Sequence, residues 1–100
     1  MRLNFKNIKD SPLNLMRRAG YSFVGRDSQK GDEGYERRVS SGDYPKFHAF
    51  VKKEEDYIFV NLHLDQKKPS YTGSHAHSGE YEDSKLLEKE AEIIRKVFEA

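Results

Sequence analysis

The histidines of this chain are the residues best suited to chemistry, and most of them lie in its second half. The segment SHAHSGEY carries His75 and His77, and the segment HLD before it adds His63 and Asp65. Imidazole and carboxylate groups are suitable ligands for zinc, manganese or iron. The chain has no cysteine, so thiolate ligands are excluded. The first question is therefore which of these histidines lie close enough to bind the same ion.

Two neighbouring segments with alternating polarity bear on that question. In KFHAFVK (46–52) and YIFVNLHLD (57–65), aliphatic residues alternate with polar or aromatic ones, which predicts a β-hairpin. Successive side chains of a strand point to opposite faces. Pairing the aliphatic residues across the hairpin leaves His48 and His63 on the other face, with Asp65 one step beyond His63. Such cross-strand neighbours lie roughly 5 to 8 Å apart.

We therefore predict a divalent-metal site on this face, with zinc or manganese as the candidate ion. In the alternative interpretation, the strand histidines are half-exposed residues packed on aromatic rings and the loop histidines are solvated. The predicted metal ligands are His48, His63, Asp65 and His77, with His75 and Glu80 in reserve.

A second interpretation uses the same face to bind single-stranded RNA or DNA. Sheet domains hold unpaired bases with stacking aromatic rings flanked by lysine and arginine. The formal net charge is only +1, whereas nucleic-acid-binding domains usually have a basic surplus. A homodimer interface without a ligand is a third possibility. The predicted ligand-binding or nucleic-acid-binding residues are Phe50, Phe59, Lys67, Lys68, Tyr71, His75, Glu80, Arg37 and Arg38.

No catalytic motif assigns a reaction to these residues. Ser74 and Ser78 adjoin histidines, but the chain has neither a nucleophile elbow of the GxSxG type nor a glycine-rich phosphate loop. A histidine pair can perform general acid–base chemistry on a phosphodiester, yet nothing in the sequence fixes the necessary geometry. Whether the protein is an enzyme stays open.

Helices and further strands must position this hairpin. DSPLNLMRRAGY predicts a short helix with Ser11 as its cap and Pro12 in its first turn. YSFVGR and YERRVS predict two more strands, and residues 3–5 indicate a weak edge strand. The C-terminal segment predicts a second helix, capped by Asp83 or Ser84, with apolar residues at three- and four-residue steps.

These elements predict an α+β two-layer sandwich. It consists of one helix, about four antiparallel strands and a second helix, with the helices packed on one face of the sheet. One hundred residues correspond to a single domain over 1–100. No apolar run approaches the roughly 20 residues of a membrane span, and the N-terminus lacks the apolar core of a secretion signal. We expect a cytoplasmic bacterial protein without a membrane partner.

Two resemblances add to this interpretation. FHAFVKKEEDYIFVNLHLDQKKPSYTGSHAHSGEY resembles a family of small bacterial proteins with no assigned activity, so it implies no residue role. LMRRAGYSFVGRDSQKG is similar to the opening of HicA-type toxins, which have a double-stranded-RNA-binding-like fold. Those toxins carry a glycine–serine–histidine segment, with the histidine catalytic, soon after the first strand. Here GSH occurs much later, ending at His75, so the resemblance implies only a helix–sheet–helix layout.

Overall fold

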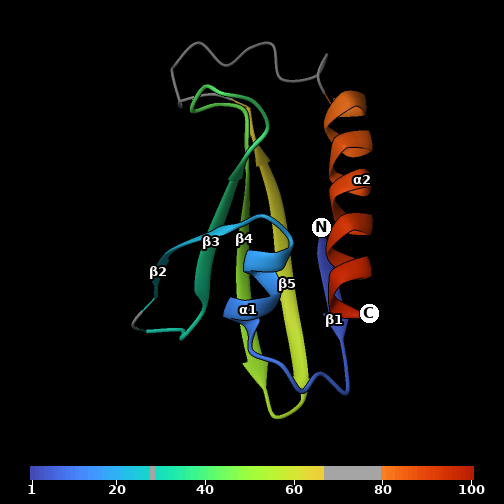
Figure 1. Cartoon of the computed structure of the whole chain (residues 1–100). Helices are drawn as coiled ribbons and strands as arrows, with labels where there is room; N and C mark the ends of the chain where they lie inside the picture. Colours follow the sequence, from blue (N-terminus) through green and yellow to red (C-terminus); the bar gives the residue numbers. More distant parts are fainter. Residues whose placement is uncertain (28, 67–79) are drawn as a thin grey trace.

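The computed structural model describes residues 1–27, 29–66 and 80–100 of the chain (Figure 1). These ranges contain five strands and two α-helices. The α+β class therefore agrees with the expectation from the sequence. In chain order the elements are β1 (Arg2–Phe5), α1 (Pro12–Arg18), β2 (Ser22–Arg26), β3 (Glu33–Arg38), β4 (Lys46–Glu54), β5 (Tyr57–Asp65) and α2 (Glu80–Phe98).

The strands form one antiparallel sheet in the order β1-β5-β4-β3-β2. The hairpin of β4 and β5 is central, with β1 beside β5 at one edge and β2 at the other. The expectation of about four strands was one too few. The segment 3–5, which indicated only a weak edge strand, lies in β1, and β1 pairs with β5 over four positions. A strand therefore precedes the first helix, and the predicted helix–sheet–helix order is only partly correct.

A two-residue turn sets the register of the central hairpin. Glu54 pairs with Tyr57, which leaves Glu55 and Asp56 as the turn. Glu55 has φ 56°, in the left-handed region that tight turns use. The strands predicted over 46–52 and 57–65 left the four residues KEED between them as the turn. That turn was too long, because Lys53 and Glu54 continue β4. Once the turn is fixed, every pair further along the hairpin is fixed as well.

One face of the sheet carries the hydrophobic core. Alternate residues of the strands are buried there together with residues of both helices, and α1 also contacts α2 (Figure 1). Both helices therefore lie against the same face, and neither covers the other one, which we call the open face. The buried strand residues include Leu3, Phe5, Tyr35, Phe47, Ala49, Val51, Ile58, Val60 and Leu62, and the buried helix residues include Leu15, Met16, Ala91, Ile94 and Phe98.

The predicted start of the first helix is confirmed, and the predicted start of the second helix is wrong. Ser11 caps α1 by accepting a hydrogen bond from the backbone N–H of Asn14 at 3.2 Å. Helix α2 begins at Glu80, earlier than the predicted cap at Asp83 or Ser84. Acidic residues favour the first turn of a helix, and this one opens with the acid-rich residues EYED. In the described ranges, neither helix combines the length and apolar character that crossing a bilayer requires.

Ile94 provides a test of how α2 packs on the sheet. Its side chain is 0 % exposed, whereas the neighbouring Ile93 is 43 % exposed. We expect Ile94→Ala to lower the free energy of unfolding by about 2 to 4 kcal/mol, the range for emptying a buried site of that size. Urea denaturation measures the change. Ile93→Ala is the matched control and should cost much less; equal losses would contradict this packing.

Candidate functional site

The open face of the sheet carries the predicted strand histidines. Cross-strand pairing arranges its side chains in rows that run across neighbouring strands. The first row consists of Glu36, His48 and His63, the second of Gly34, Phe50, Asn61 and Arg2, and the third of Lys52, Phe59 and Asn4.

His48 and His63 are direct cross-strand partners in the first row. Asp65 follows His63 on the same face, and its Oδ2 lies 3.7 Å from Nδ1 of His48. The ring of Phe50 is near both imidazoles, with centroid distances of 4.5 Å to His48 and 6.0 Å to His63. Three predicted metal ligands are thus close together, while the fourth, His77, lies outside the described residues.

These three side chains do not surround a common point. Among the residues that the structure describes, no group of three or more histidine, aspartate or glutamate side chains is arranged to hold a metal ion. His48 and Asp65 are within ion-pair distance, whereas the ring of His63 is in T-shaped contact with the ring of Phe50. A metal ion would therefore require His63 to rotate toward the other two.

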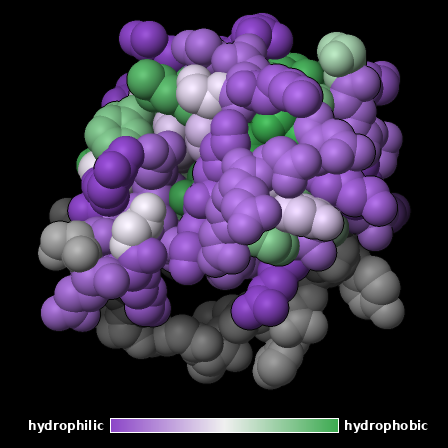
Figure 2. Space-filling view, turned by 90° about the horizontal axis from the view of Figure 1, so that it is seen from below, coloured by the Kyte–Doolittle hydropathy of each residue, from purple (hydrophilic) through white to green (hydrophobic). Residues whose placement is uncertain are grey.

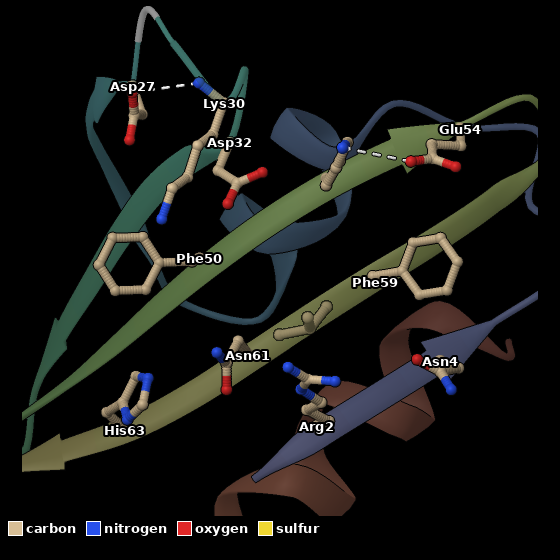
Figure 3. A pocket seen from close by; sticks show the side chains of 12 residues that line it. Arg2, Asn4, Asp27, Lys30, Asp32, Phe50, Glu54, Phe59, Asn61 and His63 are labelled. Carbon is tan, nitrogen blue, oxygen red and sulfur yellow. Dashed lines mark hydrogen bonds and ion pairs between the residues drawn. The ribbon is translucent and has the colours of Figure 1, made fainter.

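A cavity of about 720 Å³ lies on the open face beside the histidine pair. Figure 3 shows Phe50, Phe59 and Asn61 on the central strands, with His63 at one end of the group. Lys30 extends from the loop between β2 and β3 toward Phe50, and Arg2 lies on β1 beside Asn61 (Figure 3). Phe50 and Phe59 are 39 % and 38 % exposed. The cavity therefore offers aromatic rings to a ligand.

The charges around this cavity are balanced. Lys52 Nζ lies 3.2 Å from Glu54 Oε1. Asp27 accepts hydrogen bonds from the backbone N–H groups of Gln29 and Lys30, which lower the pKa of its carboxyl. Seen from below, the molecule is also mainly hydrophilic, with only scattered hydrophobic residues (Figure 2). The charged lining residues are Arg2, Lys30, Lys52, Asp27, Asp32 and Glu54.

Arg37 does not join the open face. Its side chain lies on the helix-covered side, where Nε and Nη2 donate to the carboxylate of Glu90 at 2.8 and 2.6 Å. Glu90 is only 2 % exposed and also accepts from the Tyr21 hydroxyl at 2.7 Å. Burial raises the pKa of Tyr21, and hydrogen bonding to Glu90 raises the pKa of Arg37. Arg37 thus serves a structural ion pair, while Arg38 is exposed and pairs with Asp43 at 3.3 Å.

Of the other predicted ligand-binding residues, one lies in a described helix and the rest lie outside the described residues. Glu80 is the first residue of α2. The roles of the residues beyond β5 stay predictions, because Lys67, Lys68, Tyr71, His75 and His77 lie outside the described residues.

The sequence interpretation also missed residues that line the cavity. Asn61 lies two residues from His63 and Lys52 lies four residues from His48, so each shares a face with that histidine. The alternation in the hairpin could therefore have identified both residues. Arg2 and Lys30 carried no such signal, because the first depends on β1 and the second on the path of a loop. The guanidinium of Arg2 has no ion-pair partner among the described residues.

Comparisons of the chain with models of protein families, with curated proteins and with solved structures find no match. The resemblances to HicA-type toxins and to a family of small bacterial proteins therefore stay predictions. The functional argument depends on the geometry of the open face.

The buried carboxylate of Glu90 gives a second stability prediction. Removing one partner of a buried ion pair typically costs roughly 3 to 5 kcal/mol. We expect Glu90→Gln to approach the lower end, because the side chain of Arg37 is 32 % exposed. The control is Glu92→Gln on the same helix, whose carboxylate pairs with Arg95 at the surface. Similar thermal unfolding of the two variants would show that Glu90 does not hold the helix to the sheet.

Proposed function

We propose that this protein is a ligand-binding domain whose site is the cavity on the open face of its sheet. The observation that carries the proposal is the cavity itself, with two half-exposed phenylalanine rings among its lining residues. Its volume of about 720 Å³ falls in the range of small-molecule pockets, roughly 300 to 1,000 Å³. Aromatic side chains that stay accessible in such a cavity can stack on a ligand.

The lining favours a small molecule with a flat ring and polar substituents. Phe50 and Phe59 offer ring faces or edges, and Asn61 and Asn4 offer amide donors and acceptors. Cations and carboxylates both line the cavity, so substituents of either charge find a partner. A nucleobase or another heteroaromatic ring has this combination of a flat apolar face and a hydrogen-bonding edge.

Single-stranded nucleic acid is less well supported on this face. A polyanion gains most of its affinity from an excess of cations. Here Lys52 and Glu54 pair with each other, as do Lys46 and Glu36. Arg37 is engaged with Glu90 on the other side of the sheet. Binding of RNA or DNA therefore stays a prediction, and so does a homodimer through this face.

The stacking role of Phe50 can be tested with defined probes. We expect adenosine, titrated into the ¹⁵N-labelled full chain, to shift the amide signals of residues around Phe50 and Asn61. Phe50→Ala should weaken this binding by roughly 5- to 100-fold, because stacking a base on an aromatic side chain contributes about 1 to 3 kcal/mol. Phe23→Ala is the matched control, since Phe23 is 47 % exposed but does not line the cavity.

Two outcomes would count against the proposal. In the first, neither adenosine nor an aromatic amino acid shifts the amide signals around the cavity. In the second, Phe50→Ala and Phe23→Ala weaken binding equally. A parallel titration with single-stranded oligothymidine at low salt separates the nucleic-acid alternative. Tight, strongly salt-dependent binding of the oligonucleotide without binding of free adenosine would favour that alternative.

A further inference from the structure

We propose that His48, His63 and Asp65 bind a divalent transition-metal ion at the end of the open face. The site shares His63 with the proposed ligand cavity but is distinct from it, because His48 and Asp65 do not line that cavity. The inference depends on the register of the central hairpin, on the contact between His48 and Asp65, and on the side chains that surround them.

The register brings the two imidazoles within reach of one ion. His48 and His63 are directly paired across the hairpin, and both side chains project from the open face. Directly opposed residues on one face have Cβ atoms about 4.5 to 5.5 Å apart. An imidazole nitrogen binds zinc at about 2.0 to 2.1 Å, so rings on such neighbours can share one ion.

The contact between His48 and Asp65 supplies a second donor that is nearly in place. Two donors bound to one tetrahedral zinc ion at such distances are about 3.3 Å apart. His48 Nδ1 and Asp65 Oδ2 are already 3.7 Å apart. A metal ion between these two atoms requires only a small adjustment, and the side chain of Asp65 is 41 % exposed.

The neighbouring charges leave Asp65 available to a cation. Lys46 is the cross-strand partner of Asp65, yet its ammonium lies 3.1 Å from Glu36 and over the ring of Tyr44. Among the described residues, the side chain within ion-pair distance of the Asp65 carboxylate is therefore His48 and not Lys46. Lys46 is paired with Glu36 and not with Asp65, so the carboxylate of Asp65 keeps a negative charge that favours a metal cation.

His63 is the ligand that must move. Its ring is in T-shaped contact with the ring of Phe50, with the two centroids 6.0 Å apart. It makes no hydrogen bond within the described part of the chain. A rotation of this exposed side chain toward His48 breaks no polar contact there. The resulting set of two imidazoles and one carboxylate suits zinc, manganese or iron(II), with water in the remaining positions.

Isothermal titration of the full chain with zinc chloride tests the site. We expect one ion to bind, and His48→Ala and His63→Ala each to weaken binding by at least about 100-fold, since losing even an outer partner of a ligand costs about 10- to 100-fold. Asp65→Asn should weaken it by at least about tenfold. The matched control is Asp32→Asn, which removes a carboxylate from the open face at the cavity and should leave zinc affinity unchanged.

A separate experiment tests whether the histidines of the segment SHAHSGEY bind the zinc ion instead. A His75→Ala/His77→Ala double variant that still binds zinc supports the assignment to the hairpin. Loss of zinc binding in that double variant, with His48→Ala and His63→Ala unaffected, would overturn it. If a hairpin variant does not fold by circular dichroism, the imidazole NMR signals of the natural chain decide. Zinc must shift the signals of both His48 and His63, and unchanged signals would reject the site.

The metal site and the ligand cavity can fail separately. His48→Ala removes a metal ligand but leaves the cavity lining intact, so it should lose zinc and keep adenosine. Phe50→Ala should lose adenosine and keep zinc. Zinc binding that disappears in Phe50→Ala but persists in His48→Ala would contradict the metal site.

Discussion

The two-residue turn between β4 and β5 is the constraint on which the faces of the sheet depend. With Glu55 and Asp56 in the turn, His48 must pair with His63. A slip of one residue would move every side chain of β5 to the opposite face and place His63 against the helices. The aliphatic residues of β5 would then face solvent, so burial of the core opposes the slip. The same burial that stabilises the fold thereby holds the histidines together.

The pairing of Glu90 with Arg37 and Tyr21 determines how the second helix lies on this sheet. An unpaired carboxylate with 2 % exposure would lose its hydration without compensation. Helix α2 is therefore favoured in the rotation that brings Glu90 to Arg37 on β3, while Ile94 and Ala91 face the core. Because α1 packs beside α2 on the same face, both helices are committed to one side. The open face is left for aromatic and polar side chains.

The part of the fold that depends on local periodicity could be predicted from the sequence. Alternation in the central hairpin identifies the buried residues and the histidine face, and apolar steps in the C-terminal segment identify Ile94. The strand β1 could not be identified with the same certainty, because four residues form a stable strand only through pairing with the distant β5. Arg37 has the chemistry of a nucleic-acid contact, but its partner lies 53 residues away. The cavity likewise depends on Lys30 and Arg2, which tertiary structure alone brings to the sheet.

His63 belongs to both proposed sites, and this connects them physically. It lines the cavity at one end and faces His48 across the hairpin. A ligand that contacts the His63 ring in the cavity and an ion that draws this ring toward His48 must compete for one side chain. A ligand confined to Phe50 and Phe59 leaves the ring free to rotate. Binding linkage is reciprocal, so each ligand changes the affinity of the other by the same factor. Weaker binding of each ligand in the presence of the other would show that the ligand in the cavity reaches His63. An unchanged affinity would show that this ligand is confined to Phe50 and Phe59.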